Sequence, residues 1–251
     1  MSGEVILYDY WRSSAAYRVR IALNLKGLAY RPVPIDLRLG EQGGAGYTAR
    51  NPQGLIPALE IDGHLLTQSL AIVDYLDRTR PDPPLLPADP AARAAVLARA
   101  LVIAADIHPI QNLRVMNRLK SQFGASDDAV VEWNRHWIAS GFAALEAQAP
   151  DTGLFGGAAP DLADLCLVPQ MANARRFELP LDCYPRLVRI DAALRELPAF
   201  AAAAPEAVKI DLPHCAAARL PLANWLQQEP VHHARPDPPG RFPALSAVSD
   251  L

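Results

Sequence analysis

The segment Trp11-Arg12-Ser13-Ser14 holds the first residues whose types and placement could do chemistry. It separates a short apolar run at residues 5–8 from a segment with helical spacing, so it joins a predicted strand to a predicted helix. The carboxyl end of a strand and the positive end of a helix dipole stabilise an anion or a thiolate. A serine hydroxyl there can donate a hydrogen bond to a bound thiolate. Position alone favours the plainer interpretation, in which a serine only caps the helix.

Two further positions could hold an extended peptide and a carboxylate. A cis bond between Ile56 and Pro57, at the start of a predicted strand, would turn the Ile56 backbone outward to pair with a peptide. X-Pro bonds are cis in only about 5–6% of cases, so an ordinary strand-start proline is the alternative. Gln68 and Ser69 open a predicted helix, where free backbone N–H groups and a hydroxyl could hold a carboxylate or simply cap the helix.

The elements that must position these residues follow the order of a small α/β sandwich. The pattern predicts strands at residues 5–8, 30–36, 56–61 and 64–67, helices behind Ser13-Ser14 and from Ser69, and a flexible glycine-rich loop at 40–46. Pro32 and Pro34 place the second strand at an edge, and Asp62-Gly63 indicates a hairpin. This order predicts a thioredoxin-like domain over residues 1–80, followed by a proline-rich linker at 81–90.

Residues 91–207 predict an all-helical domain. Leu97, Leu101, Ala104 and His108 recur on one helical face, and further helices are expected over residues 130–147, 162–177 and 190–197. Asp161, followed three residues later by an acidic residue, predicts a capping box with a structural role. Residues 208–251 form an extension that turns proline-rich and that we expect to be partly irregular.

Composition excludes several classes of function. A net charge of −3 over 251 residues argues against non-specific nucleic-acid binding, and no apolar stretch is long enough to cross a membrane. The three cysteines show no zinc-ligand spacing, so no metal site is expected. Their sparse, odd number fits a reducing compartment, and the first residues lack the pattern of a secretory signal. These features predict a cytoplasmic protein.

Six stretches, in this order and spread over about residues 4 to 205, resemble the zeta class of the glutathione S-transferase family: WRSSAAYRVRIALNLKG, NPQGLIPAL, TQSLAI, LLPADP, DIHPIQNLRV and DLCLVPQMANARRF. The resemblance implies the glutathione S-transferase fold, glutathione as cofactor and a homodimer. It also implies an enzyme of aromatic and tyrosine catabolism. Its reaction would be the cis–trans isomerisation of a dicarboxylic diketo acid, maleylacetoacetate or maleylpyruvate, through reversible addition of a thiolate to the double bond.

The resemblance also implies where glutathione binds. Ser13 would donate to the sulfur, with Ser14 close by, and the Ile56 backbone would pair with the cysteinyl part beside a cis Pro57. The remaining two contacts concern the γ-glutamyl part, whose carboxylate would be held by Gln68 and Ser69 and whose amine would face Asp106 across a dimer interface.

On the electrophile side, the resemblance places Arg12 near the substrate together with His108, Asn112, Arg114 and Arg176. A guanidinium can grip a carboxylate through two hydrogen bonds, which suits a dicarboxylic substrate. The four-residue spacing of His108 and Asn112 predicts a shared helix face, with Arg114 about 120° away on an ideal helix. A half-buried structural histidine and solvated surface arginines are the plainer alternatives.

Two departures from the zeta pattern leave other functions open. Ala15 stands where the class commonly has a cysteine, which weakens a reductive dehalogenase but not an isomerase. Gly54-Leu55 replaces a more polar pair that could bind glutathione. Another zeta-class transferase or lyase, and a non-catalytic glutathione-binding protein on the same fold, therefore remain as alternatives.

Overall fold

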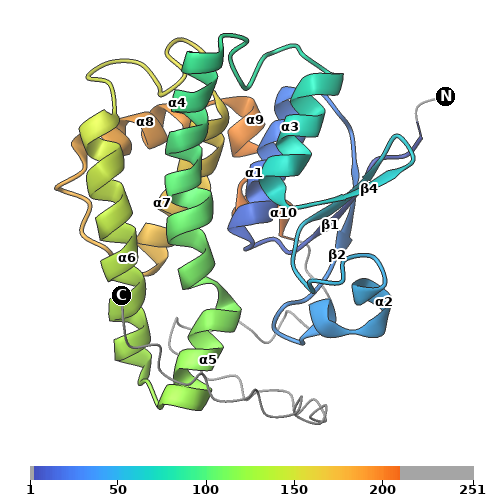
Figure 1. The fold of residues 1–251 in the computed structure, drawn as a ribbon, viewed down its shortest axis with the longest axis vertical. Coiled ribbons are helices and arrows are strands. Elements are labelled where there is room, and N and C mark those ends of the chain that lie inside the picture. Colours follow the sequence, from blue (N-terminus) through green and yellow to red (C-terminus); the bar gives the residue numbers. More distant parts are fainter. Residues whose placement is uncertain (1–2, 210–251) are drawn as a thin grey trace, which may run out of the picture.

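The computed structural model describes residues 3–209, so the predicted extension lies outside the described residues from position 210 onward. A four-stranded sheet with its helices leads into a helical half (Figure 1). This arrangement confirms the predicted fold class. No helix among residues 3–209 combines the length and apolar character needed to cross a membrane.

The sheet has the strand order β2-β1-β3-β4, formed by β1 (Ile6–Asp9), β2 (Arg31–Pro34), β3 (Ala58–Ile61) and β4 (His64–Thr67). Strand β1 runs parallel to β2 and antiparallel to β3, and β3 and β4 form the predicted hairpin. The prolines of β2 lie at an edge, as predicted, because proline has no N–H to give to a second neighbour.

The two faces of the sheet bury different residues. Leu7 and Leu59 belong to the main core, where α1 (Ser14–Leu25) and α3 (Ser69–Thr79) lie between the sheet and the helical half (Figure 1). Tyr8 and Ala58, one residue along each strand, belong to a separate cluster with Tyr47, because successive side chains point to opposite faces.

The expected glycine-rich loop is partly helical. It contains a 3₁₀ turn (Glu41–Gly43) and α2 (Ala45–Thr48). The buried Tyr47 anchors α2 against the ring of Tyr8, with the two ring centroids 6.0 Å apart. Tertiary packing thus orders a segment in which glycine content alone indicated flexibility.

The helical half begins with α4 (Pro90–Leu101), which continues through a π-helical turn (Val102–Ile107) and a 3₁₀ turn (His108–Gln111). Helix α7 (Leu162–Arg176) is buried along most of its length and starts with the predicted Asp161 capping box. The other helices are α5 (Leu113–Phe123), α6 (Asp127–Gln148), α8 (Pro185–Arg195), α9 (Pro198–Ala201) and α10 (Pro205–Val208). The sequence patterns did not predict α5, α9 or α10.

The four residues predicted to share one face of α4 and its continuation, Leu97, Leu101, Ala104 and His108, are not its buried row. The structure buries Val96, Ala100, Ile103 and Ile107, whereas Leu101 is 44% exposed. Within α4 itself both rows have the same helical spacing and both are apolar, so periodicity does not separate them. Packing of α4 against α7 selects the buried row.

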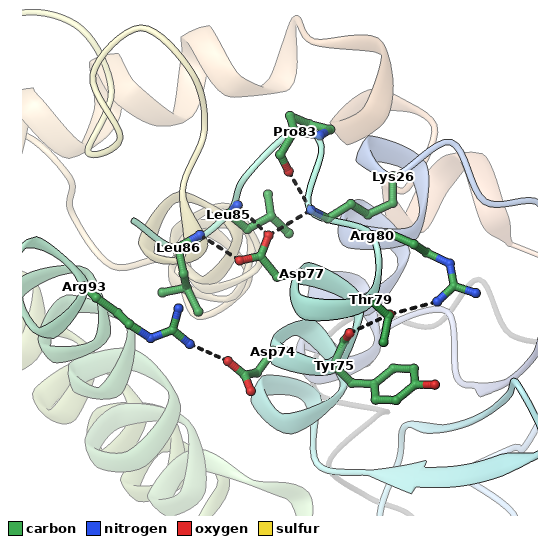
Figure 2. A network of polar contacts seen from close by, with 10 residues as sticks. All are labelled: Lys26, Asp74, Tyr75, Asp77, Thr79, Arg80, Pro83, Leu85, Leu86 and Arg93. Carbon is green, nitrogen blue, oxygen red and sulfur yellow. Dashed lines mark hydrogen bonds and ion pairs between the residues drawn. The ribbon is translucent and has the colours of Figure 1, made fainter. Parts of the chain in front are cut away.

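The linker is fixed to the sheet-containing half by one carboxylate, Asp77 of α3 (Figure 2). Its two oxygens accept hydrogen bonds from the amides of Leu85 at 2.7 Å and Leu86 at 3.2 Å, and Oδ1 also pairs with Lys26 Nζ at 2.8 Å. The ammonium of Lys26 donates in turn to the carbonyl of Pro83. These contacts determine where α4 starts relative to α3.

Candidate functional site

Strand register brings the three predicted site segments to one edge of the sheet. Tyr8, the last residue but one of β1, pairs with Ala58, at the start of β3, and Ala58 pairs with Thr67, at the end of β4. The strand-to-helix junction after β1, the Ile56-Pro57 bond before β3 and the Gln68-Ser69 pair after β4 are therefore neighbours.

Ser13 is the N-cap of α1, as its position predicted. Its Oγ accepts a hydrogen bond from the amide of Ala16 at 3.2 Å, and its own amide donates to the carbonyl of Tyr10 at 2.7 Å. A hydroxyl that only accepts from the backbone keeps its proton for another acceptor. The capping role and the donation of a hydrogen bond to a thiolate are therefore compatible. Ser14, the first residue of α1, is buried.

The bond between Ile56 and Pro57 is cis, as the resemblance implied. Two hydrogen bonds hold the segment before this bond in place. The carbonyl of Leu55 accepts them from Tyr47 Oη and Asn51 Nδ2, both at 2.6 Å. Gly54 has a φ of +60°, and a Cβ there would lie 3.0 Å from the carbonyl oxygen of Gln42. The backbone of this loop therefore requires glycine at position 54, which accounts for half of the Gly54-Leu55 departure.

The simple-cap interpretation of Gln68 is wrong. Gln68 occupies the N-cap position of α3 with a φ of +67° but makes no side-chain cap hydrogen bond. Its Nε2 instead donates to Gln53 Oε1 at 2.7 Å. The first turn of α3 is thus left without a side-chain acceptor at its N-cap, and such a helix N-terminus is a suitable place for a carboxylate. Ser69 beside it is only 6% exposed.

Three predicted substrate residues, Arg12, His108 and Arg176, are linked by charge interactions. The Arg12 guanidinium lies 4.3 Å from the ring centroid of Trp11, and that of Arg176 lies 5.0 Å from the ring centroid of Phe177. Burial, together with the nearby charge of Arg12, lowers the pKa of Arg176 to about 10. Burial, followed by the charges of Arg18 and Arg176, lowers the pKa of His108 to about 3. The site therefore combines cationic arginines with a neutral imidazole.

The predicted shared helix face of His108 and Asn112 is wrong. His108 opens a 3₁₀ turn, and Asn112 lies beyond it with an extended backbone as the N-cap of α5. Its Oδ1 accepts from the amide of Arg114 at 3.2 Å. The chain leaves its first helical axis here and starts a new helix, so an angle drawn on one ideal helix does not apply. The Arg114 side chain is exposed, as is that of Asp106.

A cavity of about 310 Å³ lies beside the site loop. Tyr10 and Trp11 line it from the loop, and Val208 and Lys209 line it from the end of the described chain. None of Ser13, Ile56 or Ser69 is among its lining residues, so it adjoins the predicted glutathione-binding segments without containing them.

Sequence reasoning missed a buried amide pair behind the site. Gln111 Nε2 donates to Gln170 Oε1 at 2.7 Å, and both side chains are almost fully buried. The pair ties the turn that carries His108 to α7, which carries Arg176. The quoted motifs contain both glutamines, but their distance in sequence gave no indication that they meet. Arg18 was also missed, and its signal was the presence of two arginines in the otherwise apolar stretch YRVRIAL.

Comparisons with known proteins agree with this architecture. The family described as "Glutathione S-transferase, N-terminal domain" matches residues 3–78. Maleylacetoacetate isomerase of Rhizobium meliloti (strain 1021) is 50% identical over 212 residues, which cover 83% of this chain and 100% of that protein. Maleylpyruvate isomerase of Ralstonia sp. is 44% identical over 205 residues, covering 80% of this chain and 97% of that protein.

Solved structures give the same result. The holo structure of a maleylpyruvate isomerase, described as a bacterial zeta-class glutathione S-transferase, matches with a TM-score of 0.80 at 44% identity, covering 82% of this chain and 99% of the other. A maleylacetoacetate isomerase from Anaeromyxobacter dehalogenans 2CP-1, with bound GSH in its active site, matches with a TM-score of 0.74 at 44% identity, covering 83% and 97%.

The fold and these likenesses place the chain in a defined class: it belongs to the glutathione S-transferase family. Within that family, the relatives that match it over nearly their whole length carry the names maleylacetoacetate isomerase and maleylpyruvate isomerase.

Proposed function

We propose that this chain is a glutathione-dependent isomerase that converts the cis double bond of maleylacetoacetate or maleylpyruvate to trans. The observation that carries the proposal is an N-cap serine whose hydroxyl proton is free for a ligand, directly after Arg12, whose charge in turn reaches Arg176 at the end of α7. The names of the relatives support the same reaction. We further propose that residues 1–80 bind glutathione and residues 91–207 bind the substrate.

The residues present fit glutathione. The α3 N-terminus lacks a side-chain cap and can take a carboxylate, with Gln68 and Ser69 as its side-chain ligands. Ile56 lies just before the paired part of β3, next to the cis bond, and its backbone can pair with the cysteinyl part. When bound, glutathione would supply the thiolate that adds to the substrate alkene, leaves a single bond free to rotate and departs again unconsumed.

The chain itself would stabilise charge. The Ser13 hydroxyl donates to the sulfur and, with the α1 N-terminus, favours the thiolate over the thiol. Arg12 and Arg176 bind the substrate carboxylates and hold the reacting alkene in place. His108 is neutral at pH 7 and can therefore accept or donate a hydrogen bond without adding a charge. Asn112 and Arg114 complete the proposed electrophile side.

We also infer that the enzyme is a cytoplasmic homodimer. Leu65 on β4 and Leu101 on α4 are 42% and 44% exposed, and a contact between copies would cover such large apolar side chains. Asp106 lies on the turn that follows α4, where a partner could bring it to the γ-glutamyl amine. The two cysteines in the described part of the chain are free thiols, as a reducing compartment allows. Sedimentation of Leu101→Glu should show monomers where the unmodified chain shows dimers.

The decisive experiment is an ultraviolet assay of both isomerisations, with and without glutathione. A glutathione-dependent rate with one substrate well above the other supports the proposal and names the substrate. Binding of glutathione without turnover of either substrate would instead indicate a non-catalytic binding protein or another transferase.

Two variants assign the roles. Ser13→Ala should raise the thiol pKa of bound glutathione and so move the pH–rate profile to higher pH, by analogy with the loss of one oxyanion-type donor. Arg176→Ala should lower kcat/KM by about 100-fold while glutathione affinity stays unchanged, because it removes a substrate contact only. Arg118→Ala, an exposed arginine on α5, is the control and should leave both unchanged.

A further inference from the structure

Helix α1 carries two arginines, Arg18 and Arg20, that are each only 1% exposed but differ in how they are satisfied. The Arg20 guanidinium donates to both carboxylate oxygens of Asp9 at 2.8 Å and to the carbonyls of Trp11 and Ala203. Arg20 is therefore a fully paired structural cation. Arg18 is not.

The guanidinium of Arg18 makes one long hydrogen bond, from Nη1 to Ser69 Oγ at 3.3 Å. Its Nε and Nη2 are buried without a hydrogen-bond partner among residues 3–209. The thiol of Cys166 is near enough to interact with it, but burial raises the pKa of Cys166 to about 11, so that thiol is neutral. Within the described residues, Arg18 is thus a buried positive charge without a compensating anion, an arrangement that is strongly unfavourable in a protein interior.

The charge of Arg18 lies beside the N-terminus of α3, where a ligand carboxylate could bind. Ser69, its single partner, opens α3 at the helix N-terminus that lacks a side-chain cap. Because Ser69 Oγ accepts from Arg18, the serine hydroxyl proton remains available to a ligand on the other side. A carboxylate at the α3 N-terminus would then receive the Ser69 hydrogen bond and would at the same time supply the negative charge that Arg18 lacks.

We propose that Arg18 is a positioning residue for the γ-glutamyl carboxylate of glutathione, which it attracts by charge and orients through the Ser69 hydroxyl. The inference rests on the proposed function, in which Ser69 binds that carboxylate. The inference adds a residue that solvent hardly reaches. Its unpaired charge destabilises the unliganded fold, and the bound carboxylate relieves that destabilisation.

This role differs from a structural one in its effect on stability. Arg18→Met replaces an uncompensated buried charge with an apolar side chain of similar length, so the thermal midpoint of the ligand-free protein should stay unchanged or rise. Arg20→Met is the matched control, two residues away on the same helix and equally buried. It should lower the midpoint, because it leaves Asp9 buried without its partner.

The affinity for glutathione, by contrast, should fall when Arg18 is replaced. In isothermal titration of the whole chain, Arg18→Met should weaken glutathione binding by at least about tenfold, the scale of one charge-assisted hydrogen bond. The analogue γ-aminobutyryl-cysteinyl-glycine, which lacks only the γ-glutamyl carboxylate, should bind Arg18→Met and the unmodified chain within about twofold of each other. Arg18→Lys, which keeps the charge, should recover part of the lost affinity.

A double-mutant cycle with Ser69→Ala tests the route through the hydroxyl. Arg18→Met should cost clearly less glutathione affinity in the Ser69→Ala background than in the unmodified one. Full additivity overturns the inference, as does an equal loss with glutathione and with the decarboxylated analogue, or unchanged glutathione binding in Arg18→Met. Failure of the unmodified chain to bind glutathione at all overturns the proposed function itself, which separates the two results.

Discussion

Removal of the Asp77 carboxylate should destabilise the fold far more than removal of Asp74, three residues earlier on the same helix. Asp77 is 8% exposed and accepts three hydrogen bonds, two from linker amides and one from Lys26 (Figure 2). Asp77→Ala would leave two buried amides and a buried ammonium without that acceptor. Asp74 pairs with Arg78 and Arg93 at a more exposed position.

The magnitude follows from these contacts. Each hydrogen bond to a charged group contributes about 1.5–3 kcal/mol, and breaking a buried ion pair costs about 3–5 kcal/mol. In the variant, Lys26 still donates a hydrogen bond to the carbonyl of Pro83, and water can reach part of the opened linker. The loss of stability should therefore lie near the lower end of these values. We expect a loss of about 4 kcal/mol in the free energy of unfolding for Asp77→Ala. For Asp74→Ala we expect a loss of about 0–1 kcal/mol.

Urea denaturation at pH 7.5 would measure both variants, followed by circular dichroism and by intrinsic tryptophan fluorescence. Asp77→Asn should lie between the two, because an amide keeps one oxygen as an acceptor. A free energy of unfolding for Asp77→Ala within about 1 kcal/mol of that for Asp74→Ala would refute the reasoning, since it would mean that the linker is not held by this carboxylate.

Three further outcomes follow from the structure. The pKa of His108 falls from an ordinary value of 6.5 to about 3 on folding, so the unfolded chain takes up the proton first and stability falls as the pH drops through this window. Between pH 7.5 and pH 5, this contribution is about 2 kcal/mol in urea denaturation, and His108→Gln should abolish it; an equal pH dependence in the variant would contradict this. Gln111→Ala and Gln170→Ala should each cost about 1–3 kcal/mol in the same assay, and the double variant should cost less than their sum. Additive losses would show that the buried amide pair does not act as a unit. Asp164→Ala should cost about 3 kcal/mol by urea denaturation, because its carboxylate accepts from three backbone amides, whereas a loss below about 1 kcal/mol would mean that water replaces it.

Local signals determined the parts of the fold that depend on neighbouring residues. The Asp62-Gly63 turn, the edge position of β2, the Ser13 N-cap and the Asp161 capping box all follow from conformations or hydrogen bonds within a few residues. The cis Ile56-Pro57 bond was different, because it was expected only from the resemblance of a whole stretch.

Long-range packing decided what local patterns left open. In the alanine-rich α4, two adjacent rows were equally apolar, and only contact with α7 showed that Ala100 and not Leu101 is buried. The break after His108 moved Asn112 off the expected helix face, because a change of helix axis depends on where the next helix can pack.

By itself, the sequence determined the order of elements, the class of fold and the residues that a zeta-class transferase would use. Those features rest on residue types and on spacing along the chain. The tertiary structure alone showed that Arg18 lies against Ser69 with no anion from the described part of the chain beside it, and that Gln111 meets Gln170. Each pair is separated by more than 50 residues, so its contact depends on how α1 packs on α3, and the turn at His108–Gln111 on α7, and not on any local pattern.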